Sequence, residues 1–184
     1  MAERGALVRV NRELGVDFDW RPFYLHPEIP PGGVRVAELF GPERAAAFDR
    51  RLRAFAAEFG VPIRPPERAP NTLPALAMTE YARAAGALDG VRDALMRAHW
   101  VEGADIEADD VLAAAAEAAG LDPGEAVAAA RDPAWIDRVR RARAEAIERG
   151  VTAIPTYWIG GAPLVGCQPF DVVARALRKR GVAA

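Results

Sequence analysis

GVTAIPTYWIGG, at residues 150–161, followed by APLVGCQP at residues 162–169, decides the fold of this chain. Residues 156–159 are β-branched or aromatic, which favours a strand, and Gly160-Gly161 can form a tight turn with positive φ angles. Leu164 and Val165 then begin a return strand. The segment therefore predicts a β-hairpin.

Pro155 stands at the head of the first strand of this hairpin. Proline cannot donate a hydrogen bond to a sheet, so one side of the strand is expected to stay unpaired. We expect the bond between Ile154 and Pro155 to be cis, which would turn the preceding backbone outward. An extended substrate could pair with such an edge. The predicted substrate-binding residues are Ala153, Ile154, Pro155 and Thr156.

The composition is that of a globular protein with one substantial core, since 51% of the 184 residues are hydrophobic and 27% are charged. A net charge of -2 gives no electrostatic reason to bind nucleic acid or an anionic membrane. Residues 1–14 carry several charges where a signal peptide would have an apolar core, so we expect a cytoplasmic protein. A single cysteine, Cys167, excludes an internal disulfide and an all-cysteine metal site.

The rest of the chain is mostly helical in pattern, with one further strand. Alternation predicts a strand over residues 16–23, with Val16, Phe18 and Trp20 on one face. Helical spacing predicts helices over residues 1–14, from Leu39 to Gly60, and over 73–86, 90–101, 108–119, 123–130 and 133–149. Prolines between residues 61 and 70 favour irregular structure. A last helix is expected after Pro169, with Val172, Val173, Ala176 and Leu177 buried.

Several motifs together carry a family resemblance. GVTAIPTY at 150–157, GCQP at 166–169 and the closing helix resemble the C-terminal half of DsbA-family thioredoxin-fold proteins, in particular the cytoplasmic FrnE-like branch. WRPFYLHP at 20–27, NTLPAL at 71–76 and AHWVEGADI at 98–106 resemble the same family. The resemblance implies an α/β fold with a thioredoxin-like sheet and an inserted all-helical subdomain. Residues 1–35 and 150–184 would form the thioredoxin-like domain without its first strand, and residues 36–149 the insertion.

By this resemblance, the protein is a bacterial thiol-disulfide oxidoreductase or isomerase without a cofactor, acting on protein or small-thiol disulfides. The family's Cys-x-x-Cys lies where the missing strand meets the first helix, and it is absent from these 184 residues. No catalytic residue is therefore identified, and we expect these 184 residues by themselves to be redox-inactive. Either the natural start lies upstream, or the chain is a shortened relative. If it is stable, the strand at 16–23 should pair with the hairpin, or two copies should associate edge to edge as a homodimer.

Two other functions remain open. A glutathione-dependent isomerase of the 2-hydroxychromene-2-carboxylate isomerase type, a group that also includes kappa-class glutathione transferases, would use glutathione, but that group usually carries Trp-Gly and Asp-Arg near the tail instead of GCQP at 166–169. A non-catalytic relative would keep only the peptide-binding groove beside Pro155.

The remaining candidate residues favour structural roles. Cys167 precedes a helix N-terminus, a setting that favours a reactive thiolate. We nevertheless predict that it is a small, buried residue with a structural role. His26 and His99 are expected to be structural because their spacing matches no metal site.

Overall fold

The computed structural model describes residues 4–58 and 60–183. The chain divides into two compact units, one formed by residues 1–21 and 144–184 and the other by residues 22–143. The changeovers at 21/22 and 143/144 come earlier in the chain than the predicted boundaries at 35/36 and 149/150. The proline-rich segment after residue 21 thus belongs, by its contacts, to the helical unit.

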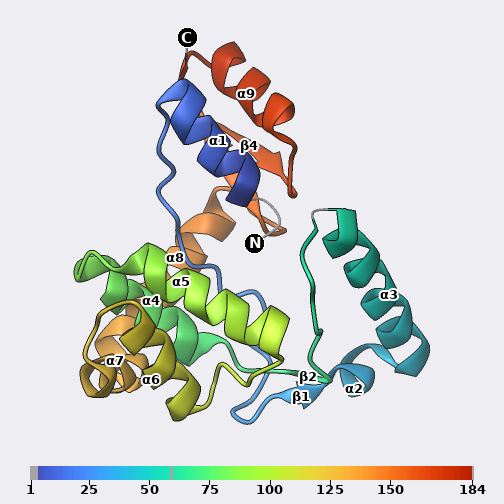
Figure 1. Ribbon diagram of the computed structural model, residues 1–184, viewed down its shortest axis with the longest axis vertical. Helices are drawn as coiled ribbons and strands as arrows, with labels where there is room; N and C mark the ends of the chain where they lie inside the picture. The colour runs from blue at the N-terminus through green and yellow to red at the C-terminus, as the bar shows by residue number, and fades with distance from the viewer. Residues whose placement is uncertain (1–3, 59, 184) are drawn as a thin grey trace. The chain divides into compact units, whose positions relative to one another are not determined.

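The first unit consists of a hairpin and two helices (Figure 1). Strand β3 (Thr156–Ile159) pairs antiparallel with β4 (Ala162–Val165), with Thr156 opposite Val165 and Ile159 opposite Ala162. Helices α1 (Arg4–Leu14) and α9 (Phe170–Lys179) lie side by side next to this hairpin. The predicted hairpin and last helix are present, and residues 1–3 of the predicted first helix lie outside the described residues.

The core of this unit lies between one face of the hairpin and the two helices. Tyr157 and Ile159 alternate with exposed Trp158, as expected for a strand with one buried face. They form one apolar cluster with four helix residues: Leu7 and Val10 from α1, and Val173 and Leu177 from α9. Burial of these aliphatic side chains, each typically contributing about 1.5–3 kcal/mol, holds the hairpin against the helices.

The predicted strand over residues 16–23 is wrong, because this segment has no regular secondary structure. Its alternation is nevertheless real, since Val16, Phe18 and Trp20 all pack on the core cluster of the unit. A strand needs a ladder partner, and in the described ranges β3 pairs with β4 alone. Direct pairing of this segment with the hairpin, one of the two predicted outcomes, does not occur within the part of the chain that the structure describes.

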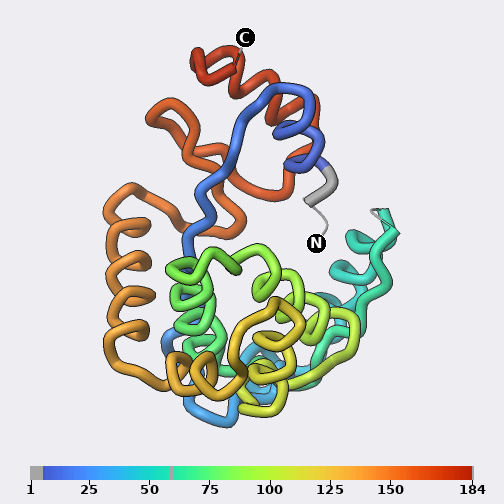
Figure 2. The backbone as a smooth tube through the Cα atoms, turned by 60° about the vertical axis from the view of Figure 1, so that its left-hand side comes forward, coloured from blue at the N-terminus to red at the C-terminus, as the bar shows by residue number. Residues whose placement is uncertain are grey.

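The second unit is helical. Its elements are α2 (Val36–Phe40), α3 (Pro42–Glu58), α4 (Leu73–Ala84), α5 (Leu88–Arg97), a π-helical turn η1 (Ala98–Glu102), α6 (Asp109–Ala118), α7 (Pro123–Arg131) and most of α8 (Pro133–Glu148). Figure 2 follows the backbone through α4 to α7, which pack together. Met78, Val91 and Leu112 are fully buried among many alanines, which allow the helices to approach closely.

Two details of this unit differ from the prediction. The helix expected from Leu39 to Gly60 is broken at Gly41, whose φ of 79° interrupts it before Pro42 starts α3, and Phe59 lies outside the described residues. A short strand β1 (Val34–Arg35) pairs with β2 (Arg68–Ala69). Strand β2 lies between residues 61 and 70, the stretch that we expected to be irregular. The pairing is possible because neither Arg68 nor Ala69 is a proline.

Candidate functional site

The four predicted substrate-binding residues lead into β3. Ile154 is 48% exposed, whereas Ala153, Pro155 and Thr156 are half-buried. The Thr156 hydroxyl donates a hydrogen bond of 2.6 Å to the Ala153 carbonyl, which closes a tight bend around Ile154. The bond between Ile154 and Pro155 is cis. The bend thus presents the Ile154 side chain to solvent, and the substrate role of these residues stays a prediction.

One edge of β3 is open. The Gly166 N–H donates to the Pro155 carbonyl at 2.8 Å, which makes Thr156 and Val165 a non-hydrogen-bonded pair in the antiparallel ladder. By the same alternation, the backbone groups of Tyr157 and Ile159 face β4. Those of Thr156 and Trp158 face the other way, where no strand of the described residues pairs with them. Two residues of β3 therefore offer an N–H and a C=O each to an incoming strand.

The outer edge of β4, in contrast, is capped. Its outward backbone positions are Pro163, which has no N–H, and Val165, whose carbonyl accepts a 2.7 Å hydrogen bond from the Gln168 amide. The Arg180 guanidinium donates to the outward Pro163 carbonyl at 3.5 Å, and also to the carbonyls of Ile159 at 3.1 Å and Ala162 at 2.8 Å, at the two sides of the turn. The hairpin can therefore pair with a further strand along the open edge of β3 but not along the capped edge of β4.

Arg180 is a residue that the sequence analysis missed. It follows the last helix, and its guanidinium reaches back to the Gly160-Gly161 turn, where Gly160 has φ 51° and Gly161 has φ 82°. Two consecutive positive φ angles define the type I′ turn that suits a two-residue hairpin. An arginine at the end of a helix that packs on a hairpin is a weak signal, because helix C-termini favour basic residues in any case.

Cys167 lies at the Pro155 end of the hairpin. It follows Gly166, whose N–H is bonded to the Pro155 carbonyl, and it precedes α9, whose N-cap is Pro169. The residue is half-buried, so the preferred prediction of a buried cysteine is wrong. The loop between β4 and α9 leaves it partly open because the helix begins three residues later.

Each histidine contacts a neighbouring side chain, and the structural role expected for both stays a prediction. The His26 Nδ1 lies 2.8 Å from a Glu28 carboxylate oxygen, and the His99 ring packs edge-on against Trp100 with centroids 4.6 Å apart. Burial lowers the pKa of His99. Residues 4–58 and 60–183 contain no cluster of three or more His, Cys, Asp or Glu side chains suited to a metal ion. Among these same residues, no helix combines the length and apolarity needed to cross a bilayer.

A hairpin packed against an N-terminal and a C-terminal helix, with a helical unit inserted between them in sequence, defines a thioredoxin-like α/β protein. Residues 5–178 match the family described as the DSBA-like thioredoxin domain. The chain belongs to this family, and the predicted fold class is confirmed.

Three known proteins illustrate the similarity. The uncharacterized protein YwbO of Bacillus subtilis (strain 168) is 26% identical over 165 residues, which are 88% of this chain and 81% of that protein. A probable DsbA oxidoreductase from Streptomyces coelicolor superposes with a TM-score of 0.83 at 26% identity, covering 98% of this chain and 83% of its own. A 2-hydroxychromene-2-carboxylate isomerase, at 18% identity and a TM-score of 0.77 over 97% of this chain and 88% of its own, shares the fold.

Proposed function

We propose that this chain serves thiol-disulfide exchange by docking an extended protein or thiol substrate along the open edge of β3, beside Ile154 and Pro155. The observation that carries the proposal is the unequal pair of hairpin edges. Thr156 and Trp158 direct backbone donors and acceptors away from β4, while Arg180 and Gln168 donate to the outward carbonyls of Pro163 and Val165 on the opposite edge. Membership in the DsbA-like family supports this chemistry over other uses of a free strand edge.

In this proposal the residues of the chain bind and orient the substrate. Main-chain hydrogen bonds would give affinity without sequence preference, and the exposed Ile154 and Trp158 side chains would contact alternate side chains of the substrate. A dithiol-disulfide cycle needs two cysteines, and these 184 residues contain one. We therefore expect the chain by itself to bind disulfide-containing substrates but not to turn them over.

The test combines binding with turnover. Carboxymethylated insulin B chain is titrated into the protein while Trp fluorescence and the backbone amide signals of Thr156 and Trp158 are followed by NMR. Ile154→Glu should weaken binding because it places a charge beside the edge, and Val182→Glu is the matched control, since Val182 is exposed to a similar extent (45% against 48%) in the same unit. Insulin reduction in the presence of the protein should be no faster than the uncatalysed reaction in buffer alone.

Three results would count against the proposal. Binding that leaves the Thr156 and Trp158 amide signals unchanged would show that the substrate does not dock on the β3 edge. Equal weakening by both glutamate variants would make the effect one of general charge. Catalysed insulin reduction would show that the chain needs no second cysteine. Glutathione binding without peptide binding would instead favour the isomerase type of activity.

A further inference from the structure

The unit formed by residues 22–143 contains a cavity of about 470 Å³. Its walls come from the extended segment between Tyr24 and Pro31, which we call the proline segment, from Asn71 and Leu73 at the start of α4, and from Arg140 and Arg143 on α8. The volume lies within the range of about 300–1,000 Å³ that is typical of sites for small molecules. None of the substrate-binding residues proposed above contributes to this cavity.

Two guanidinium groups line the same wall. Arg140 and Arg143 are three residues apart on α8 and so lie on one face of the helix. The Arg143 Nε donates to the Tyr24 carbonyl at 2.8 Å, which fixes the plane of its guanidinium. Among the described residues, its two Nη groups make no hydrogen bond, although the guanidinium attracts the Glu28 carboxylate electrostatically. Arg140 donates a longer bond of 3.3 Å to the exposed carboxylate of Asp137. Both arginines therefore keep N–H groups for a ligand.

A buried amide adds an independent donor. Asn71 is 8% exposed and lines the cavity. Its Oδ1 accepts hydrogen bonds from the Tyr24 hydroxyl at 3.1 Å and from the Leu73 N–H at 3.0 Å, which assigns the other atom as the NH₂ group. Among the hydrogen bonds of the described residues, that Nδ2 makes none. It is not one of their fully buried unpartnered polar atoms, so it is open to the cavity and can donate to an acceptor that a ligand supplies.

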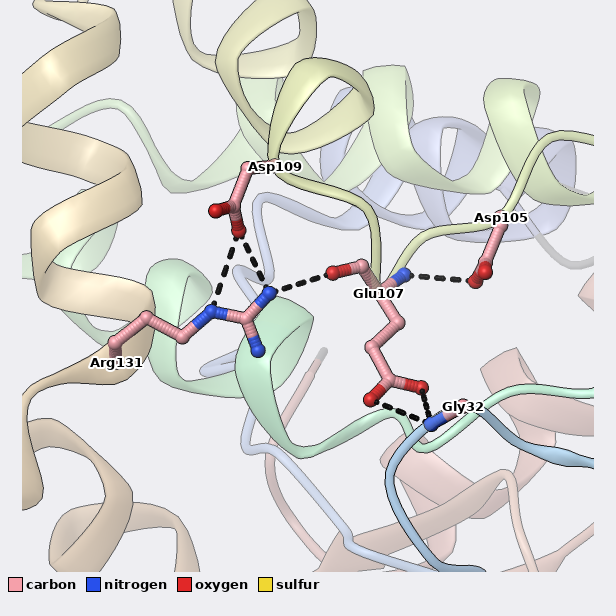
Figure 3. Close-up of polar contacts among 5 residues, drawn as sticks. All are labelled: Gly32, Asp105, Glu107, Asp109 and Arg131. Atoms are coloured by element: carbon pink, nitrogen blue, oxygen red, sulfur yellow. Dashed lines mark hydrogen bonds and ion pairs between the residues drawn. The ribbon is translucent and has the colours of Figure 1, made fainter.

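A carboxylate clamp holds two walls of the cavity in place (Figure 3). Both Glu107 carboxylate oxygens accept from the Gly32 N–H, at 3.0 and 3.1 Å, and one also accepts from the Asn71 N–H at 3.3 Å. The Glu107 backbone is held in turn, because its N–H donates to Asp105 and its carbonyl accepts from Arg131 at 2.7 Å. Glu107 thereby positions both Asn71 and the end of the proline segment before any ligand arrives.

The lining selects the chemical class of the ligand. A planar carboxylate matches the donor forks of two arginines and can also accept from an amide. Glu28 lies on the cavity wall, and hydrogen bonds from its own backbone N–H and from His26 lower its pKa, so at neutral pH its charge repels a dianion about twice as strongly as a monoanion. Pro27, Ile29 and Pro30 supply apolar wall beside these polar groups.

We propose that this cavity binds a small organic monocarboxylate, with its carboxylate on Arg140, Arg143 and the Asn71 amide and its apolar body against the proline segment. The two arginines supply the charge, the amide supplies direction, and Glu28 disfavours dianions. The site is independent of the docking edge on β3 and would stand if the proposed function failed.

Benzoate is the probe, and benzamide is its uncharged match. In NMR titrations of the whole chain, benzoate should bind saturably and shift the Asn71 side-chain amide signal, while benzamide binds at least about tenfold more weakly because it carries no negative charge to pair with the two guanidinium groups. Arg140→Gln and Arg143→Gln should each weaken benzoate binding by about fivefold or more. Arg141→Gln, on the same helix but outside the cavity lining, is the control and should bind as the wild type does.

Arg143→Gln also removes the bond to the Tyr24 carbonyl, so a folding defect in this variant is checked by its amide spectrum, and Arg140→Gln then decides alone. The proposal is overturned if benzoate fails to saturate any site, or if it shifts signals elsewhere but not those of Asn71. It is equally overturned if benzamide binds as tightly as benzoate, or if the Arg141 variant loses as much affinity as the Arg140 variant.

Discussion

Gly160 has no room for a side chain. A Cβ at this position would lie 2.8 Å from the Arg180 Cβ, and the backbone φ of 51° already favours glycine. Gly161, the next residue in the turn, has φ 82° but open space around it. We expect Gly160→Ala to lower the free energy of unfolding by about 2–3 kcal/mol and Gly161→Ala by about 1 kcal/mol, because only the first adds a steric clash to the backbone strain.

Urea unfolding of both variants measures this difference. The amide spectrum of the folded state should show the larger changes around Arg180 in the Gly160 variant. Equal losses of stability would mean that Arg180 moves aside without cost and that its bonds to the turn carbonyls are dispensable.

His99 should make the stability depend on pH. Burial lowers its pKa below the ordinary value of 6.5, so the unfolded chain takes up the proton more readily than the folded chain does. The contribution is therefore constant above about pH 6.5 and is lost as the pH falls from there towards the lowered folded pKa, with a slope of at most about 1.4 kcal/mol per pH unit. Nearby Asp105 opposes the effect.

Unfolding free energies of the wild type, His99→Asn and His99→Phe, measured between about pH 5 and 8, check this expectation. Both variants should show a shallower loss on the acid side, whatever their stability at neutral pH. An unchanged slope in both would assign the acid sensitivity to other groups.

Residue roles were predictable where the signal is local. Asp122 precedes Pro123 at a helix start, and its side chain indeed accepts from the Glu125 N–H at 2.8 Å. Arg180 and Glu107 bind backbone groups 17 or more positions away in the chain, so no spacing rule could indicate them. The partial exposure of Cys167 depends on where α9 begins, which sequence patterns give only to within a few residues.

At the level of elements, the hairpin was predictable because its turn, strand residues and flanking proline agree. The segment at 16–23 has the alternation of a strand but not the structure, since alternation reports burial and a strand also requires a paired backbone. The cavity at residues 24–31 could not be predicted, because its two sides come from segments more than a hundred residues apart.

The connection between the proline segment and α6 depends on Glu107. Glu107→Gln replaces an ionised acceptor of backbone N–H groups by a neutral amide, and we expect the free energy of unfolding to fall by about 1–3 kcal/mol. Glu117→Gln, an exposed position on α6, should change it by less than about 0.5 kcal/mol. Urea unfolding compares the two, and faster amide exchange at Gly32 and Asn71 should accompany the first. A loss no larger than that of the control would contradict the clamp.

For the whole molecule, the open edge of β3 leads us to expect association of two copies, the second of the two outcomes predicted for a stable chain. Light scattering should give a mass approaching twice 19.8 kDa as the concentration rises. The Thr156 and Trp158 amides should become protected from exchange in parallel, because they face the open side of β3. Trp158→Lys should shift the equilibrium towards the monomer.

A mass of one chain at every concentration would contradict this expectation. A dimer in which the two amides still exchange freely would place the contact on another surface. The capped edge of β4 provides an internal control, since its exchange should not change with concentration.

The first unit is assembled from two segments that are distant in sequence: α1 precedes the helical unit, and the hairpin and α9 follow it. During synthesis, α1 emerges before the helical unit, and the partners of its apolar residues Leu7 and Val10 on β3 and α9 are synthesised more than 140 residues later. The helical unit is complete in the meantime, because domains generally fold as units in the order of translation. Until α9 is released, the apolar face of α1 lacks its partners on β3 and α9, and we expect chaperones to bind this exposed face during synthesis.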